Sequence, residues 1–150
     1  MNVGFTGSRV VPPGTHPLIR DLVAELPPDT WVITGGCIGV DAIVARYAYR
    51  RRLNVHTVLP ADRSRVDPQW MVWCTSHTEM GEGTTYRDRD EALVRRSDRL
   101  IALPLHTEED RRSVRSGTWM TIRIALGVGK DVEIYLLQPH GALQGKYRAS

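Results

Sequence analysis

The sequence predicts an α/β fold in three layers, with a central, mainly parallel sheet of about five or more strands. Short apolar runs that fit buried strands alternate along the chain with segments whose apolar residues recur at helical spacing. This repeated order of strand, helix and strand favours parallel strands covered by helices on both faces. The chain has 150 residues, and no repeat or linker divides it, so we expect a single domain over residues 1–150.

The first part of the chain carries the clearest alternation. A short apolar strand over 2–6 precedes a helix whose apolar stripe runs over 18–26, up to Pro27-Pro28. A second strand over 31–34 precedes a helix with an apolar stripe over 40–48, and a third strand covers 55–59. These elements predict three parallel strands with two helices between them.

The middle of the chain is less regular. Residues 61–83 show no sustained period and are predicted to form an irregular insertion. A helix over 84–97 and a strand over 100–103 follow, and then a charged stretch, 105–115, that we expect to be an exposed loop able to act as a lid.

The last part of the chain returns to regular structure. Trp119, Ile122 and Ala125 predict a helix that ends near Gly127 and Gly129. A fifth strand over 132–137 and a basic tail over 138–150 complete the chain.

Composition narrows the function classes. No apolar stretch approaches the roughly 18 residues of a membrane span, and no signal peptide is visible, so we expect a soluble cytoplasmic protein that does not contact membranes. The net charge is +3, but acids are interleaved with the basic clusters, which favours solvated faces over a nucleic-acid groove. Cys37 and Cys74 are expected to be reduced, and the five scattered histidines predict no metal site.

Three glycine-containing turns fall where parallel sheets bind ligands, at the carboxyl end of a strand and before a helix. They are Gly7-Ser8-Arg9, the loop over 35–41 (GGCIGVD) and Ser116-Gly117-Thr118. Glycine allows close approach of the backbone, and a helix start offers free N–H groups and a positive dipole end to phosphate. The turns therefore predict an anion site, although each alone also fits a plain tight turn.

Known nucleotide motifs do not match these turns. Gly35, Gly36 and Gly39 read GGxxG rather than GxGxxG, and no GxxxxGK[ST] loop is present, so we expect no cofactor. Asp41 lies near a predicted helix start, where it could cap the helix, order the loop or accept a hydrogen bond from a ribose hydroxyl.

Four segments together resemble the SLOG superfamily of Rossmann-like nucleotide-binding domains. They are GSR (7–9), GGCIGVD (35–41), YRDRDEALVRRSDRLIALP (86–104) and SGTWMTIRIALGVGKDV (116–132). The superfamily includes DNA-processing protein A, the cytokinin-activating phosphoribohydrolases and, with the closest resemblance, small stand-alone YspA-related (DUF2493) proteins. The resemblance covers residues 1–137 and implies a nucleotide-type ligand over the carboxyl ends of the strands.

Arg9 and Arg89 are expected to supply charge to the phosphate, because the planar guanidinium can donate two hydrogen bonds at once. The candidate ligand-binding residues are therefore Gly7, Ser8, Arg9, Gly35, Gly36, Gly39, Asp41, Arg89, Ser116, Gly117 and Thr118.

The resemblance to the phosphoribohydrolases breaks at one position. Arg89 aligns with their catalytic arginine and is the one candidate catalytic residue, but Thr121 stands where they carry a glutamate. Threonine is not a useful base at neutral pH, and Glu108 or Glu109 could substitute only if their loop folded inward. Cleavage of an N-glycosidic bond is therefore an alternative function and not the favoured one.

The resemblance to DNA-processing protein A implies a second alternative, binding of single-stranded DNA. The corresponding segments here read TGGCIGVD, RDRDEAL and SGTWMTI. A basic groove with stacking aromatics would serve this function. Its candidates are Arg9, Arg89, Arg95, Arg96, Tyr86, Trp70 and Trp73, although the two tryptophans could instead bury the 61–83 insertion against the sheet.

The favoured prediction is a nucleotide-binding module that senses or sequesters a nucleotide signal. Its expected partners are a nucleotide-type small molecule, alternatively single-stranded nucleic acid, and a second copy of the chain in a homodimer or higher homo-oligomer.

Overall fold

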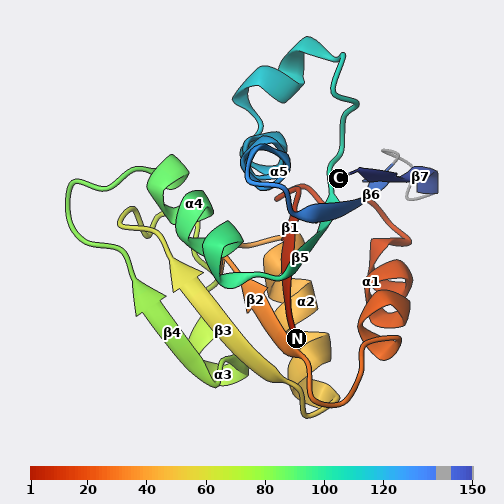
Figure 1. Ribbon diagram of the computed structural model, residues 1–150. Helices are drawn as coiled ribbons and strands as arrows, with labels where there is room; N and C mark the ends of the chain where they lie inside the picture. The colour runs from red at the N-terminus through yellow and green to blue at the C-terminus, as the bar shows by residue number, and fades with distance from the viewer. Residues whose placement is uncertain (138–142, 150) are drawn as a thin grey trace.

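One sheet of seven strands forms the centre of the computed structural model, which describes residues 1–137 and 143–149 (Figure 1). Its strand order is β4-β3-β2-β1-β5-β6-β7. The strands are β1 (Asn2–Gly7), β2 (Trp31–Thr34), β3 (Asn54–Leu59), β4 (Ser76–Glu79), β5 (Arg99–Leu103), β6 (Asp131–Leu137) and β7 (Leu143–Ala149). Strands β1 to β6 are parallel, and β7 pairs antiparallel with β6. The prediction of an α/β fold with a mainly parallel sheet is confirmed.

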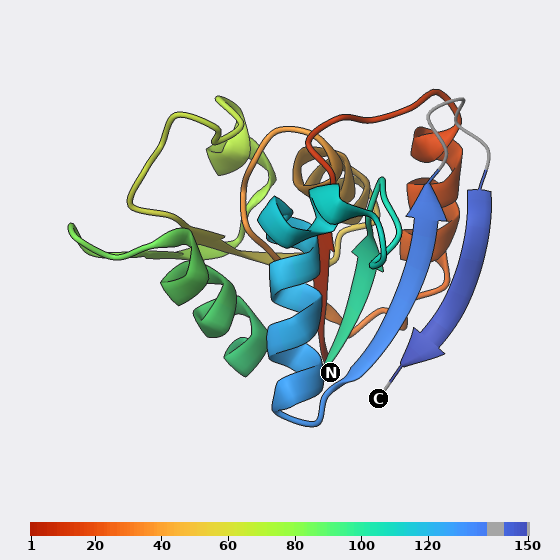
Figure 2. The same ribbon diagram turned by 90° about the horizontal axis from the view of Figure 1, so that it is seen from above.

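Helices cover both faces of the sheet, as Figures 1 and 2 show. They are α1 (Thr15–Ala24), α2 (Val40–Arg50), the single turn α3 (Trp70–Trp73), α4 (Tyr86–Arg96), the 3-10 turn η1 (Arg111–Arg115) and α5 (Gly117–Gly127). Helices α1 and α2 bury one core, with Phe5 at its centre, and α4 and α5 bury the other, around Trp119. The three-layer arrangement follows from apolar side chains on both sides of nearly every strand.

The prediction of an irregular insertion over 61–83 is wrong in part, because this segment contains α3 and the edge strand β4. The strand reads SHTE, so no apolar side chain reveals it in the sequence. It is held by buried His56 of β3, whose ring nitrogens lie 2.7 Å from Ser76 Oγ and 2.8 Å from Thr78 Oγ1. Polar contacts, not apolar periodicity, place β4.

Both tryptophans of this segment take part in packing. The Trp73 ring lies 5.5 Å from the Tyr49 ring of α2 and contacts the core, and the Trp70 ring lies 5.0 Å from that of His77. Trp73 therefore packs the segment against α2 and the core, whereas the contact of Trp70 with His77 lies within the segment.

The predicted basic tail and charged loop both contain regular structure. Residues 143–149 form β7, while 138–142 and 150 lie outside the described residues. The loop over 105–115 ends in η1 and is tied to α5, because the Trp119 indole N–H donates to His106 O at 2.7 Å. Within residues 1–137 and 143–149, no helix is long and apolar enough to cross a membrane, and no three metal-binding side chains gather.

The loops after β1 and β2 touch through their backbones. The Val40 N–H donates to Ser8 O at 3.1 Å. Gly39 has φ +89°, and a Cβ on it would lie 2.5 Å from Arg9 Cα. Only glycine allows both the conformation and the close approach, so Gly39 fixes how the two loops meet.

We therefore expect Gly39→Ala to destabilise the protein by about 2–4 kcal/mol, because a strained backbone and a steric clash add. Gly83→Ala is the matched control, since Gly83 has φ +85° but nothing within 4 Å of its added Cβ. It should cost only the backbone penalty of about 1–2 kcal/mol. Urea unfolding of both variants measures the difference, and equal losses would show that the loop contact contributes nothing.

Candidate functional site

The strand order reverses direction between β1 and β5, and this switch point is where open α/β sheets place ligands. The chain leaves β1 through the turn Gly7-Ser8-Arg9 and leaves β5 toward the start of α5. The Ser8 N–H donates to Leu103 O at 3.1 Å, which joins the ends of the two strands. The topology thus brings two of the predicted turns, Gly7-Ser8-Arg9 and Ser116-Gly117-Thr118, to the same edge of the sheet.

The start of α5 carries unused hydrogen-bond donors. Ser116 is the N-cap, and its side chain accepts the Trp119 N–H at 3.2 Å. The N–H groups of Gly117 and Thr118 meet no acceptor among the described residues. Gly117 is exposed, and a Cβ on it would meet nothing within 4 Å. Two free donors at the positive end of a helix dipole form a site suited to an anion.

The second predicted turn, residues 35–41, has many of its backbone groups bonded within the protein. The Cys37 N–H donates to Asp41 Oδ2 at 3.3 Å, and the Ile38 N–H donates to Arg65 O at 2.9 Å. Gly36 O accepts the Asp67 N–H at 2.8 Å. A phosphate could reach the amides of Cys37, Ile38 or Val40 only by displacing these bonds. Asp41 orders the loop and makes no side-chain cap at the start of α2.

Arg89 lies beneath this turn and is only 7% exposed. Its Nη1 donates to Gly35 O at 2.6 Å, and its Nε donates to Asp90 Oδ1 at 2.9 Å. A Cβ on Gly35 would lie 2.5 Å from Nη1, so any larger residue at this position would displace the guanidinium from its present contacts. Arg89 therefore joins α4 to the loop after β2, and its hydrogen bonds go to the protein.

Two buried carboxyl groups accompany this arginine. Burial raises the pKa of Asp41 to about 6, although Arg89 opposes the shift. Burial likewise raises the pKa of Asp90, again against the effect of Arg89. Burial also raises the pKa of the Cys37 thiol, so Cys37 is a protonated, unreactive thiol at neutral pH.

Asp90 is the residue that sequence reasoning missed. Helical spacing places it with Leu93 and Val94 on the inward face of α4, and that position was the available signal. The Thr121 hydroxyl donates to Gly117 O at 2.9 Å, and the Thr121 side chain also acts to lower the pKa of Asp90. Glu108 and Glu109 are exposed, and Glu108 lies 3.9 Å from Arg123. Neither Glu108 nor Glu109 therefore takes the place of the glutamate that a phosphoribohydrolase would carry at the position of Thr121.

The other predicted arginines do not meet in one groove. Arg9 is exposed at the carboxyl edge of the sheet and has no hydrogen bond or ion pair in the part of the chain described. Arg95 and Arg96 lie at the end of α4, directly before β5 begins, and thus at the opposite edge. A basic groove for DNA at the carboxyl edge of the sheet would therefore not include Arg95 and Arg96.

Comparison with known proteins supports the fold and little beyond it. No protein-family model matches the chain, and no curated protein sequence matches it. Solved structures do match.

The fold resembles that of DNA processing protein A.

The Streptococcus pneumoniae DNA processing protein A superposes with a TM-score of 0.70 at 16% identity, over 89% of this chain and 49% of its own. The Helicobacter pylori protein, described for its single-stranded DNA binding mode, gives 0.62 at 19% identity, over 89% and 64%. The protein TM1055 gives 0.61 at 20% identity, over 87% and 71%. This chain thus spans about half to two thirds of the DNA processing protein A chains, and the likeness shows a shared Rossmann-like fold.

The shifted pKa of Asp41 makes a testable change in stability. Its folded value of about 6 exceeds the ordinary 3.8, so the folded chain holds the proton more tightly than the unfolded chain. The free energy of unfolding should therefore fall as pH rises from about 4 to about 6, by at most about 3 kcal/mol, since a tenfold difference in proton affinity corresponds to roughly 1.4 kcal/mol. Asp41→Asn, which cannot titrate, should lack this component.

Urea unfolding of both proteins between pH 4 and pH 7 measures the difference between them. His56 also has a shifted pKa, but both proteins contain it and its contribution cancels in the difference. Asp90 shares Arg89 with Asp41, so the difference reports the two carboxyl groups as a coupled pair. Parallel stability profiles for the two proteins would contradict the assignment.

Proposed function

We propose that this chain binds a nucleotide or nucleotide-derived ligand, with a phosphate at the start of α5. The observation that carries the proposal is the pair of free N–H groups of Gly117 and Thr118 at the switch point between β1 and β5. Backbone amides at a helix start bind phosphate through charge-assisted hydrogen bonds and the helix dipole.

Arg9 is the side chain best placed to add charge. It follows β1 at the same edge of the sheet, is exposed and has no acidic partner in the described part of the chain. Arg89 contributes positive charge from behind the loop over 35–41, where its own hydrogen bonds go to Gly35 and Asp90. The loop over 105–115 leads directly into α5 and would select the ligand as a lid.

A sensing or sequestering role agrees better with these residues than catalysis. The Thr121 hydroxyl donates its one proton to Gly117 O, so it does not replace the glutamate of a phosphoribohydrolase. Asp90 itself is 4% exposed and paired with Arg89. This role also matches the stand-alone YspA-related subtype that the sequence resembles.

Gly117 offers a direct test, because it is the first helical residue of α5. Proline is favoured at this position, and Ser116 already has the extended backbone that proline requires of its predecessor. Gly117→Pro therefore removes one N–H while keeping the helix. Gly117→Ala is the matched control, which keeps the N–H and places its methyl group in open space.

We expect Gly117→Pro to weaken binding of AMP or ADP by about 10- to 100-fold in calorimetric titration, as the loss of one hydrogen bond to a charged group predicts. Gly117→Ala should bind nearly as the unaltered chain does. Equal affinities of all three proteins would place the phosphate elsewhere, and failure of every mono- and dinucleotide to bind would refute the proposal.

Binding of single-stranded DNA is the second candidate. The observation in its favour is a set of exposed arginines on the loops at the carboxyl edge, Arg9, Arg111 and Arg115, which have no acidic partner among the described residues. The Helicobacter pylori neighbour adds weight, because its single-stranded DNA binding mode is described. Such arginines would contact the sugar–phosphate backbone.

This candidate predicts that affinity for an oligo-dT falls steeply with salt. Arg115→Gln should lower the slope of log K against log salt by about 0.7, the value for one phosphate contact with a single strand. Arg95→Gln, at the opposite edge of the sheet, should leave the slope unchanged. Fluorescence anisotropy over a salt series measures both, and a slope near zero would reject DNA as the ligand.

A further inference from the structure

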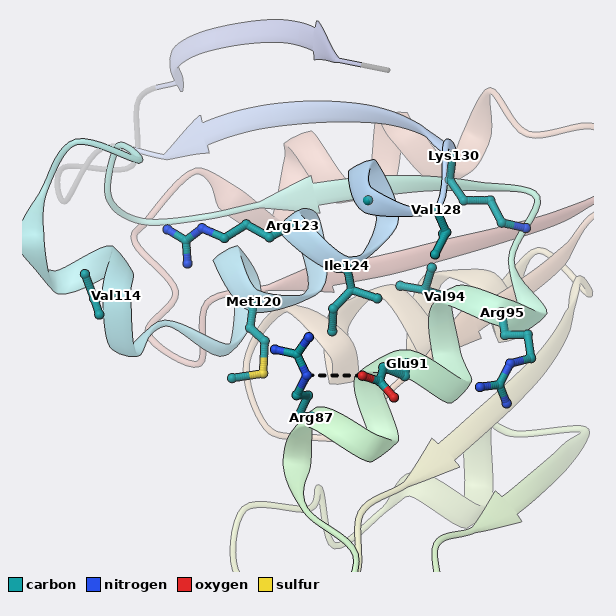
Figure 3. A pocket seen from close by; sticks show the side chains of 11 residues that line it. Arg87, Glu91, Val94, Arg95, Val114, Met120, Arg123, Ile124, Val128 and Lys130 are labelled. Atoms are coloured by element: carbon teal, nitrogen blue, oxygen red, sulfur yellow. Dashed lines mark hydrogen bonds and ion pairs between the residues drawn. The ribbon is translucent and has the colours of Figure 1, made fainter.

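A groove of about 730 Å³ lies between α4 and α5, on the face of these helices turned away from the sheet (Figure 3). At its base the buried Val94 of α4, 2% exposed, and the half-buried Ile124 of α5 point toward each other, and Met120 and Val128 extend the apolar surface along α5. None of these side chains belongs to the proposed nucleotide site.

The groove exists because α5 is apolar on two faces. Trp119, Ile122 and Ala125 are buried against the sheet. The side chains of Met120, Ile124 and Val128 lie four residues apart and line the groove instead. Arg123 is the one charged residue in the eleven of α5. A helix that is apolar nearly all round is normally covered on both faces, and here the second face is covered only in part, because Met120 and Ile124 are half-buried and Val128 is exposed.

The exposure of the groove side chains shows that it is an open trough. Val128 is 62% exposed at one end, and Val114 of η1 is 73% exposed at the other. Small-molecule sites usually enclose most of the ligand surface, which this trough cannot do. An elongated partner fits it better.

Charge around the trough is strongly one-sided. Four basic side chains and one acidic side chain line it, Arg87, Arg95, Arg123, Lys130 and Glu91. Glu91 is already paired with Arg87 at 3.1 Å, and Arg123 lies 3.9 Å from Glu108, so the excess positive charge comes from Arg95 and Lys130. Lys130 donates to the carbonyl of Ser97 at 2.7 Å, and Arg95 has no partner in the described part of the chain. A partner that covers the apolar strip must therefore bring negative charge.

This charge also argues against a second copy of the chain as the occupant. In a two-fold dimer the same surface meets itself, so four basic side chains of one copy would face four of the other. Like charges brought together at an interface cost free energy. The apolar strip favours any apolar partner, whereas its basic border selects an acidic one.

We propose that the groove between α4 and α5 binds an acidic amphipathic helix of another protein. From Met120 to Val128 the apolar strip spans eight residues, about 12 Å, which matches apolar anchors at positions i, i+3 or i+4, and i+7 of a partner helix. Arg87 and Arg123 border one end and Arg95 and Lys130 the other, so acidic residues on both sides of the anchors would meet a cation (Figure 3).

A selection experiment with an unbiased library of displayed helical peptides tests this inference. The full chain is the target, and Val128→Glu, which places a negative charge at an exposed groove position, is the counter-selection target. We expect the surviving peptides to carry a net negative charge and apolar residues at helical spacing. Survivors with a net positive charge, without helical spacing, or no survivors at all would overturn the inference.

The affinities of a selected peptide for variants of the chain then separate the contribution of the apolar strip from that of its basic border. Val128→Glu and Arg95→Glu should each weaken binding at least tenfold. Val10→Glu is the matched control, because Val10 is 65% exposed on the loop after β1, outside the groove. Equal weakening by Val10→Glu would overturn the inference. Light scattering tests the competing occupant, since a dimer that Val128→Glu converts to a monomer would assign the groove to a second copy.

Discussion

A buried arginine holds together the carboxyl edge of the sheet. Arg89 donates to the carbonyl of Gly35 and to Asp90, and Asp41 approaches Gly35 from the same side, since a Cβ on Gly35 would lie 2.5 Å from Arg89 Nη1 and 2.9 Å from Asp41 Oδ2. A buried guanidinium without partners would cost several kcal/mol, so the two carboxyl groups and the glycine carbonyl are required together. Replacement of Arg89 would leave two carboxyl groups buried without their cation, and any loss of function in such a variant would reflect the fold as much as chemistry.

These contacts give Gly35 and Gly39 a structural role in the loop over 35–41. Glycine at a strand end usually signals close approach of a ligand, but Gly35 makes room for Arg89, and Gly39 makes room for the backbone at Arg9. With the amides of Cys37, Ile38 and Val40 bonded internally, the loop over 35–41 forms a rigid wall. The free donors lie two strands away in the sheet, at the start of α5 after β5, with β1 between β2 and β5. A rigid loop after β2 and free donors at the start of α5 are compatible with a preformed anion site.

The sequence was sufficient to predict the elements whose cores are apolar. Strands β1, β2, β3, β5 and β6 and helices α1, α2 and α5 follow from their apolar residues, whereas α4 was predicted as a polar, helix-compatible stretch over 84–97. Strand β4 was missed because its four side chains are polar and its position depends on His56. Asp90 was missed because its neighbours along α4 are charged, although its helical spacing with Leu93 and Val94 pointed to the inward face. Pairing between distant segments, such as Arg89 with Gly35, has no signature in a single sequence.

The polar character of β4 has a consequence for how molecules of this protein meet in solution. An edge strand presents unpaired backbone groups to which the edge of another sheet can add. Strand β4 is only four residues long and carries a histidine and a glutamate, whose side chains are solvated and discourage such addition. Its hydroxyl groups bond inward to the buried ring of His56, which ties the strand to its neighbour β3. Strand β4 therefore discourages the addition of another strand at this edge and remains tied to β3.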